Sequence, residues 1–276
     1  MPWDIPKNNN GAALVKRNTQ KMKKIYLTLV AAALFASCTT SYHVTGVERT
    51  RILIDKRYDA QPDKEAAAFI APYKHVVDSM MSPVVGTAAE YMAAYRPESE
   101  LSNLLADILV WAGKDYGEKP DFAVYNMGGI RSALPKGTVT YGDVLEVAPF
   151  ENKICFLTLT GEKVNELFEQ IAAIGGEAVS HGVKLVITKN GKLASATLNG
   201  KPIDPKANYR VATIDFVAQG NDRMAAFKSK TNVVSPQDKS NNVMFVIMNY
   251  FKEKDKQGLS VESHKEGRIV VEGGEK

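Results

Sequence analysis

The stretch NMGGIRSALPKGTVTYGDVLEVAPFEN, residues 126–152, follows an apolar run and changes character at once. Residues 122–126 (FAVYN) predict a strand that runs into a Gly-Gly turn, and Arg131 comes directly after that turn. Phe150 then follows a proline in a polar, turn-like setting. A packed core needs neither feature, whereas a site for an anionic ligand with a flat ring uses both.

Apolar periodicity on both sides of this stretch predicts a mixture of helices and hairpins. Asn190-Gly191 between two β-prone runs is a strong hairpin signal. Because helices and hairpins do not strictly alternate, the fold class is expected to be α+β, with mixed sheets and flanking helices. Helices are predicted at 62–82, 99–113, after the capping residue Thr160 and at 240–253; strands are predicted at 122–126, 138–141, 153–159, 183–188, 193–198, 209–216, 259–263 and 267–271.

The N-terminal region has the layout of a secretory signal. Lys23 and Lys24 follow Met22, and an apolar stretch then runs to small residues before Cys38. As a helix this stretch would be about 16 Å long, too short for a hydrocarbon core of roughly 30 Å. The ending FASC resembles a bacterial lipoprotein signal, which makes Cys38 the expected lipidation site; the alternative is a simple cleaved signal with an incidental cysteine.

Three segments follow from this interpretation. Residues 1–37 form a signal peptide whose true start is expected at Met22, with 1–21 as an extension of the gene prediction. Residues 38–60 form an extended, lipid-anchored segment, and 61–276 form the folded domain. The chain is therefore expected to be exported and held by its lipid at the periplasmic side of a bacterial envelope.

Charge and cysteine content exclude some classes of function. Thirty-five basic and 31 acidic side chains leave a net charge of +4, with no basic run interleaved with aromatics, so nucleic acid is not an expected partner. Cys155 lies in an apolar run and is expected to be a buried small hydrophobe.

Four side chains are candidates for ligand contact, and each also has a structural explanation. Arg131 is either a solvated turn residue or a planar cation for phosphate or sugar oxygens. Phe150 and Phe216 each either cover the core or stack on a base. Asp222 either forms an Asx turn or accepts hydrogen bonds from a ribose diol.

The combination of motifs resembles the C-terminal domain of the 5′-nucleotidase / UDP-sugar hydrolase family. The resemblance covers about residues 60–272 and rests on six motifs in a fixed order. They are RPESELSNLLAD (96–107), NMGGIR (126–131), TYGDV (140–144), PFEN (149–152), LTGEK (159–163) and FVAQGND (216–222).

This resemblance implies a role for each matching residue. Phe150 and Phe216 would sandwich the base, and Asp222 would hold the ribose hydroxyls. Arg131 and Asn126 would contact the ribose or the phosphate side. The resemblance thus implies a ligand that is a nucleotide or nucleoside.

Two further residues have less direct matches. Asn152 would hydrogen-bond the base. Gly182 falls near the family's Ser-Gly segment and would line the pocket, although His181 disturbs the register.

The chain also departs from the family pattern. Arg96 is matched to an upstream arginine, but its spacing to Asn103 is one residue short, and Met92 replaces a second arginine. Asn221 stands where family members usually have a glycine. Because asparagine tolerates left-handed backbone angles, the turn is expected to survive this change.

Family enzymes use a separate N-terminal metallophosphatase domain, whose two metal ions activate the attacking water. None of the four histidines here lies in a D-x-H, N-H-[DE] or G-H-x-H motif, so no metal and no catalytic residue are expected in this chain. Two hypotheses remain open, together with a purely structural role for a lapsed family member. Either a separate metallophosphatase subunit with a divalent metal pair completes a split enzyme, or the chain is a non-catalytic nucleotide-binding lipoprotein.

Overall fold

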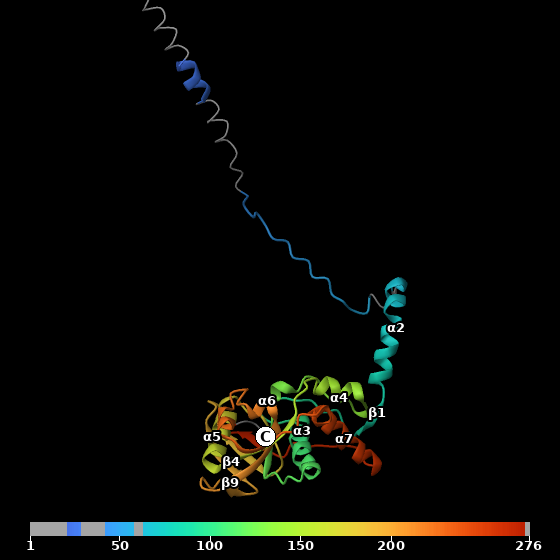
Figure 1. Cartoon of the computed structure of the whole chain (residues 1–276), viewed down its shortest axis with the longest axis vertical. Helices are drawn as coiled ribbons and strands as arrows, with labels where there is room; N and C mark the ends of the chain where they lie inside the picture. Colours follow the sequence, from blue (N-terminus) through green and yellow to red (C-terminus); the bar gives the residue numbers. More distant parts are fainter. Residues whose placement is uncertain (1–20, 29–41, 58–62, 274–276) are drawn as a thin grey trace, which may run out of the picture. The chain divides into compact units, whose positions relative to one another are not determined.

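The computed structural model describes residues 21–28, 42–57 and 63–273. The chain divides into two units, Met1–Pro62 and Asp63–Lys276. In the first unit, residues 21–28 are helical and 42–57 have neither helix nor strand. Cys38 and most of the predicted signal peptide lie outside the described residues. The second unit holds the three sheets and the helices that pack on them (Figure 1).

A central five-stranded sheet carries the candidate site. Its strand order is β10-β4-β9-β2-β5, with β2 parallel to β9 and the other pairs antiparallel. This mixed sheet with flanking helices confirms the α+β expectation. Its strands are β2 (Phe122–Tyr125), β4 (Ile154–Thr160), β5 (Ala178–Val179), β9 (Asn208–Ile214) and β10 (Thr231–Val234).

The register of this sheet brings four chain segments to one edge. Ala123 pairs with Ala212, so the parallel strands β2 and β9 end side by side. The antiparallel strand β4 begins at the same edge, because Ile154 pairs with Ile214. Strand β5 also begins there, since Ala178 pairs with Tyr125. The residues after β2 and β9 therefore meet the residues before β4 and β5.

Two smaller sheets complete the strand structure. The sheet β11-β6-β7-β8 contains the predicted hairpin, in which β6 and β7 are antiparallel and the chain turns at Asn190-Gly191. The other sheet pairs β1 with β3. The bounds are β1 (Val84–Ala88), β3 (Gly137–Thr140), β6 (Val183–Ile187), β7 (Leu193–Leu198), β8 (Lys201–Pro202) and β11 (Ile269–Val271).

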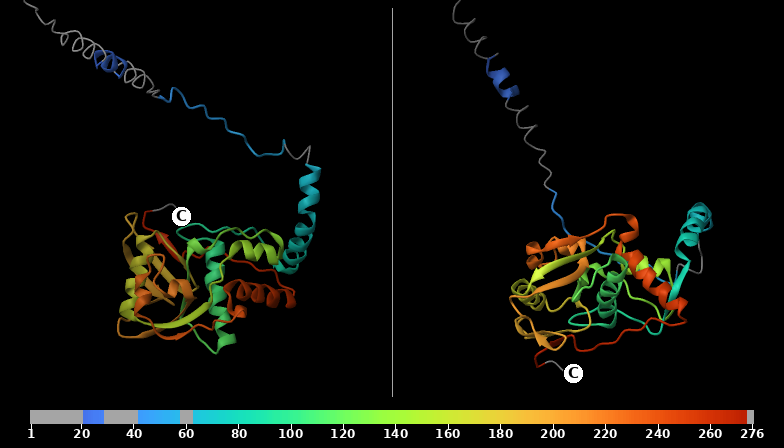
Figure 2. Two further views of the ribbon diagram at one scale, coloured as in Figure 1. Left: turned by 45° about the horizontal axis from the view of Figure 1, so that its top comes forward. Right: turned by 60° about the horizontal axis from the view of Figure 1, so that its bottom comes forward.

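Helices pack on the central sheet and fix it in place. Helix α3 packs on β2, β5 and β9, and α7 lies beside α3 and β1 (Figure 2). Helix α5 packs on β4 and β9, where Phe168 meets Phe122 of β2 with ring centroids 5.5 Å apart. Thr160 caps α5 as expected, by accepting from the Lys163 N–H. The bounds are α3 (Glu100–Ala112), α4 (Tyr141–Val147), α5 (Gly161–Ala173), α6 (Asp215–Ala218), α7 (Val243–Lys256), and the 3-10 turns η1 (Gly113–Tyr116), η2 (Met127–Gly129), η3 (Ala225–Ser229) and η4 (Lys239–Asn241).

Two strand predictions were wrong in part. The strand expected at 209–216 ends at Ile214, and Phe216 lies on the short helix α6. The strand expected at 259–263 is only an isolated bridge from Val261 to Ala88. In the first case the chain turns at the sheet edge, and this turn carries Phe216 out of the core.

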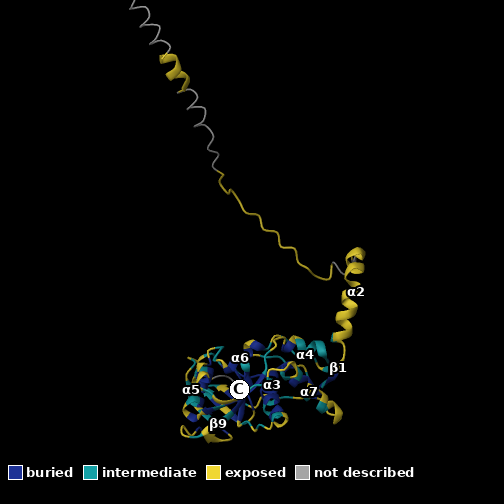
Figure 3. Cartoon of the chain, viewed as in Figure 1, coloured by how far each residue is buried: buried dark blue, intermediate teal, exposed yellow. Residues whose placement is uncertain are grey.

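Helix α2 (Lys64–Met81) forms where the amphipathic pattern predicted a helix, but its apolar side has no partner in the described chain. Asp63 caps it by accepting from the N–H groups of Glu65 and Ala66. Its apolar side chains are exposed, Phe69 by 73%, and Figure 3 shows the helix exposed along its length. Of the helices in the described residues, none is long and apolar enough to cross a membrane.

Candidate functional site

The turn after β2 places Asn126 at the sheet edge. This side chain is 3% exposed, and its Nδ2 donates to Asp222 Oδ2 at 2.5 Å. The chain then closes a 3-10 turn in which Gly129 N–H donates to the Asn126 carbonyl at 3.0 Å. A Cβ on Gly129 would lie only 2.6 Å from Asn126 Oδ1. The glycine is therefore required for Asn126 to hold its place.

The other oxygen of this amide lacks a protein partner. Asn126 Oδ1 is buried and accepts no hydrogen bond from the described residues. Leaving a buried acceptor unpaired costs about 1–3 kcal/mol, so such groups in native structures call for an explanation. The residue that carries this oxygen lines a cavity.

Two phenyl rings enter the same cavity from distant parts of the chain. Phe150 lies between α4 and β4 and is 46% exposed; Phe216 lies on α6 and is 38% exposed. Large aromatic side chains left this open toward solvent do little to stabilise a core. The cavity has a volume of about 160 Å³, and we call it the aromatic pocket. Its lining residues are Asn126, Gly128, Gly129, Phe150, Asn152, Phe216 and Asp222.

Arg131 stands next to Phe150 at the rim of the aromatic pocket. Its guanidinium carbon lies 5.9 Å from the centroid of the Phe150 ring, within the range of a cation–π contact. Its backbone N–H donates to the Val147 carbonyl at 3.0 Å, which ties the residue to α4. The side chain is exposed, and its one hydrogen bond in the described chain is a long one, 3.4 Å to the Gly128 carbonyl. The cation is thus available to a ligand.

The loop that carries Asp222 has an unusual backbone. Gly220, Asp222 and Arg223 have φ angles of +85°, +52° and +64°. Asn221 is not among the left-handed residues, so the turn does not use its tolerance of such angles; its amide donates to the Phe216 carbonyl at 2.8 Å. Left-handed non-glycine residues are uncommon and concentrate at ligand-binding sites. The strained loop places the Asp222 carboxylate in the wall of the aromatic pocket.

Glu177 supports the site from behind, and the sequence analysis missed it. Its buried carboxylate accepts from the Met127 backbone N–H and pairs with Arg96. Burial raises the pKa of this carboxyl, while the Met127 bond and Arg96 oppose the shift. The only sequence signal is an acidic residue between a glycine pair and two small apolar residues, GGEAV. This signal is too weak to identify a supporting residue.

Besides Arg131 at the rim, two predicted site residues, Arg96 and Gly182, do not line the aromatic pocket. Arg96 lines a larger hollow beside it, the lateral groove, where its Nε donates to the Gly176 carbonyl at 2.7 Å. Gly182 follows β5 and lies toward the opposite end of β2, because Ser180 N–H donates to the Ala123 carbonyl. Its nearest neighbour is Asn199, and it lines neither hollow. The structure therefore does not bring Gly182 to the site.

No metal centre is built by the part of the chain that the structure describes. It holds no group of three His, Cys, Asp or Glu side chains placed to ligate an ion. The thiol of Cys155 is buried, and burial raises its pKa to about 11. It does not have the properties of a catalytic nucleophile, because the reactive form of a cysteine is the thiolate.

Comparison with known proteins shows the family of this chain. The sequence model described as 5′-nucleotidase, C-terminal domain, matches residues 84–229. This range is more than half of the chain and includes all seven residues that line the aromatic pocket.

Two curated relatives match over much of the chain. Endonuclease YhcR of Bacillus subtilis is 31% identical over 196 residues, which cover 67% of this chain and 16% of that protein. Cell wall protein Lmo0130 of Listeria monocytogenes is 31% identical over 188 residues, covering 63% of this chain and 24% of that protein. The chain therefore spans less than a quarter of either relative.

Among solved structures, a 5′-nucleotidase precursor from Thermus thermophilus superposes with a TM-score of 0.66 at 27% identity. The match covers 79% of this chain and 45% of that one. The shared part includes the fold described above, and more than half of the longer protein has no counterpart here.

Proposed function

The chain belongs to the 5′-nucleotidase C-terminal domain family, and we propose that it binds the base and ribose of a nucleotide while a separate metallophosphatase subunit hydrolyses the phosphate ester. One observation carries the proposal. Five of the residues that the family resemblance assigned to substrate line one cavity, although they come from distant parts of the chain: Asn126, Phe150, Asn152, Phe216 and Asp222.

The aromatic pocket suits a nucleobase. Two phenyl rings offer flat apolar surfaces, and a base stacked on an aromatic side chain gains about 1–3 kcal/mol. The Asn152 amide supplies a donor and an acceptor for the polar edge of the base. Stacking is insensitive to base identity, so any preference among bases falls to Asn152 and the shape of the pocket.

Asp222 and Asn126 suit the ribose. One Asp222 oxygen already accepts from Asn126 Nδ2, and the carboxylate keeps further acceptor capacity for hydroxyl protons. The Asn126 amide lines the same pocket, and its Nδ2 bond holds the Asp222 carboxylate in position. The pair thus presents a carboxylate that a buried amide fixes in place.

Arg131 is the proposed contact on the phosphate side. A guanidinium at the rim offers planar, charged donors to an anionic group. Hydrolysis itself is assigned to the partner, because the described residues lack a set of metal ligands. The two-metal centre of such a partner would clamp and activate the attacking water.

Helix α2 is the proposed surface for that partner. Its exposed apolar side chains form one side of an eighteen-residue helix that buries none of its residues, although its end at Met81 contacts α4. Exposed apolar surface of this kind marks interaction sites. The apolar residues are Phe69, Ile70, Tyr73, Val76, Val77 and Met80.

The proposed location is the periplasmic side of the envelope, anchored through lipidated Cys38. The signal-like sequence before Cys38 supports export, and one relative is named as a cell wall protein. If no partner exists, the same pocket supports the second candidate function, a non-catalytic nucleotide-binding lipoprotein.

Calorimetric titration with adenosine, uridine and their 5′-monophosphates tests the recognition half. The double variant Phe150→Ala/Phe216→Ala should weaken binding by roughly 2–6 kcal/mol through the loss of two stacks. Tyr91→Ala is the matched control, because Tyr91 is an exposed aromatic outside the aromatic pocket. Unchanged affinity in the double variant would disprove the stacking assignment.

A pull-down from the native envelope tests the catalytic half. The chain alone should release no phosphate from AMP, and an exported metallophosphatase should co-purify with it. Tyr73→Glu on α2 should abolish this co-purification and leave nucleoside affinity unchanged. Metal-dependent hydrolysis by the purified chain alone would contradict the assignment of catalysis to a partner.

A further inference from the structure

The lateral groove is larger than the pocket that it adjoins. Its volume is about 770 Å³, against about 160 Å³ for the aromatic pocket. Ligand pockets typically measure about 300–1,000 Å³, so the aromatic pocket alone is too small for a whole nucleotide. A ligand that fills it must extend beyond it.

The two hollows share part of their wall. Gly128 and Asp222 line both of them. A Cβ at Gly128 would lie 3.5 Å from Asp222 Oδ2, so the two residues of the shared wall are direct neighbours. In the proposed binding mode Asp222 holds the ribose hydroxyls. The lateral groove therefore begins where the 2′ and 3′ oxygens of the ribose would lie.

The lateral groove carries more positive than negative charge. Arg96 and Glu177 neutralise each other as an ion pair. Lys189, in the turn between β6 and β7, and Arg223 also line the groove, and neither forms a salt bridge within the described part of the chain. Asp222 offsets one of these charges, which leaves a net positive surface.

Arg223 has an unfavourable backbone conformation. Its φ of +64° follows the +52° of Asp222, and both are unfavourable for residues with a side chain. Residues in such conformations persist only where the surrounding structure enforces them, and they cluster at ligand sites. The same strained loop thus supplies a carboxylate to the aromatic pocket and a guanidinium to the lateral groove.

We propose that the lateral groove binds a second phosphate group, carried on the ribose 3′ oxygen of the nucleotide whose base fills the aromatic pocket. The inference rests on the proposed function, because it uses the ribose position that Asp222 defines. Lys189 and Arg223 provide charged donors to this phosphate, while Arg131, next to Phe150, faces the 5′ group. The ligand class is that of nucleoside 3′,5′-bisphosphates and 3′-phosphodiester ends, and this second phosphate is bound and not cleaved.

Calorimetric titration of the full chain tests this with four probes in the adenosine series and the same four in the uridine series. The probes are the nucleoside, the 5′-monophosphate, the 5′-diphosphate and the 3′,5′-bisphosphate. The bisphosphate should bind about tenfold more tightly than the monophosphate, as expected for one added charge-assisted contact. The double variant Lys189→Gln/Arg223→Gln should remove this factor and leave the nucleoside and the monophosphate unchanged.

Lys192→Gln is the matched control, because Lys192 is exposed in the same turn but does not line the lateral groove. It should keep the full preference for the bisphosphate. A 3′-phosphodiester dinucleotide distinguishes an internal phosphate from a terminal one; a preference that depends on Lys189 and Arg223 supports the groove in either form.

Three results would overturn the inference. Equal affinity for monophosphate and bisphosphate in the unaltered chain is one. A preference for the 5′-diphosphate that Lys189→Gln/Arg223→Gln abolishes is the second, since the groove would then hold the 5′ side. A bisphosphate preference that survives the double variant is the third. A separate result would refute the proposed function: an unchanged nucleoside affinity in Phe150→Ala/Phe216→Ala. If the unaltered chain bound none of the probes, both proposals would be refuted.

Discussion

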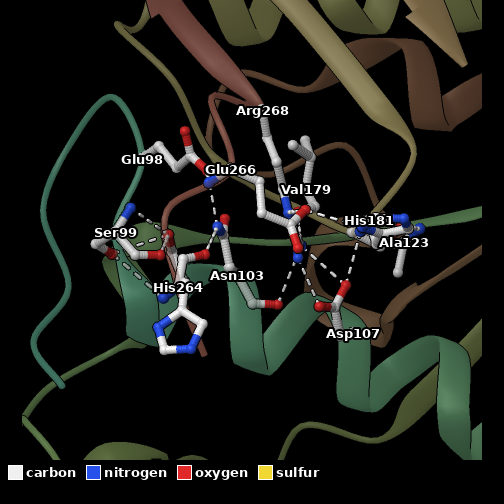
Figure 4. A network of polar contacts seen from close by, with 12 residues as sticks. Glu98, Ser99, Asn103, Asp107, Ala123, Val179, His181, His264, Glu266 and Arg268 are labelled. Carbon is white, nitrogen blue, oxygen red and sulfur yellow. Dashed lines mark hydrogen bonds and ion pairs between the residues drawn. The ribbon is translucent and has the colours of Figure 1, made fainter. Parts of the chain in front are cut away.

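Two polar clusters in this molecule have opposite characters. The first joins α3 to the C-terminal segment and is shown in Figure 4. At its centre the Arg268 guanidinium, 1% exposed, donates to both oxygens of Asp107 at 2.8 and 2.7 Å. It also donates to the Val179 carbonyl at 2.9 Å and to Glu266 at 3.1 Å. The second cluster is the wall of the aromatic pocket, where Asn126 Oδ1 accepts nothing.

The difference shows that a cluster of buried polar residues does not by itself identify a ligand-binding site. Both clusters contain buried polar groups, but the Arg268 cluster pairs its charges within the protein, so that removing one partner would leave the others uncompensated. The pocket wall leaves an acceptor unpaired, two rings open to solvent and two residues in left-handed conformations. Unpaired buried polar groups and left-handed residues are features that concentrate at ligand-binding sites.

Replacing Arg268 by methionine should have the largest effect. The variant removes a buried cation and leaves Asp107 and Glu266 without their partner, which should lower the free energy of unfolding by about 3 kcal/mol. Urea denaturation measures this loss. Nucleoside affinity of the folded protein should not change, because the cluster contributes no residue to the aromatic pocket.

Lys114→Met is the control for this variant. Lys114 pairs with Glu253 at 2.9 Å on the surface, and exposed pairs contribute little to stability. Its unfolding midpoint should stay close to that of the unaltered chain. If Arg268→Met weakened nucleoside binding more than it destabilised the fold, the assignment of a purely structural role to the Arg268 cluster would be wrong.

Gly129→Ala should have the reverse effect, a loss of affinity with little loss of stability. The new methyl group would lie 2.6 Å from Asn126 Oδ1, so the amide must move and give up its bond to Asp222. We expect nucleoside affinity to fall about tenfold, or about 1.4 kcal/mol. Calorimetric titration measures it.

A double-mutant cycle sharpens this prediction. In an Asn126→Ala background the amide is absent, so adding Gly129→Ala should cost no further affinity. Additive losses would show that the glycine acts through something other than Asn126.

The smallest predicted effect concerns Glu177 and pH. Burial raises the pKa of its carboxyl above the ordinary value of 4.5, so the folded state binds a proton more readily than the unfolded state. The proton-linked stability from Glu177 is therefore fully present below pH 4.5 and is lost as pH rises through the folded-state pKa. Urea denaturation of the unaltered chain and Glu177→Gln across this range should show a difference that grows toward acid in favour of the unaltered chain. A constant difference would contradict the raised pKa.

Much of the fold was predictable because long apolar patterns are local signals. The cap at Thr160, the Asn190-Gly191 turn and the helical spacing of α3 each depend on residues close in sequence. The short elements β1, β5, β8, β10, α4 and α6 were missed. Each of these has too few residues to show a period, and their existence depends on partners far away in the chain.

The candidate site divides in the same way. Sequence motifs pointed to Phe150, Phe216 and Asp222, which line the pocket together. They also pointed to Gly182, which lies elsewhere, because a motif match says nothing about which end of a strand a loop occupies. Glu177 and Arg223 were missed, since their roles come from burial and backbone angle.

The sequence alone determined the family, the α+β class and the residue types of the site, because these depend on local patterns and ordered motifs. Only the tertiary structure decided that the residues after β2 and β9 meet those before β4 and β5, since strand register sets which loops share an edge. It also decided that α2 keeps its apolar side exposed and that the lateral groove adjoins the aromatic pocket at Asp222. Such features depend on contacts between residues far apart in the chain, and no local pattern encodes them.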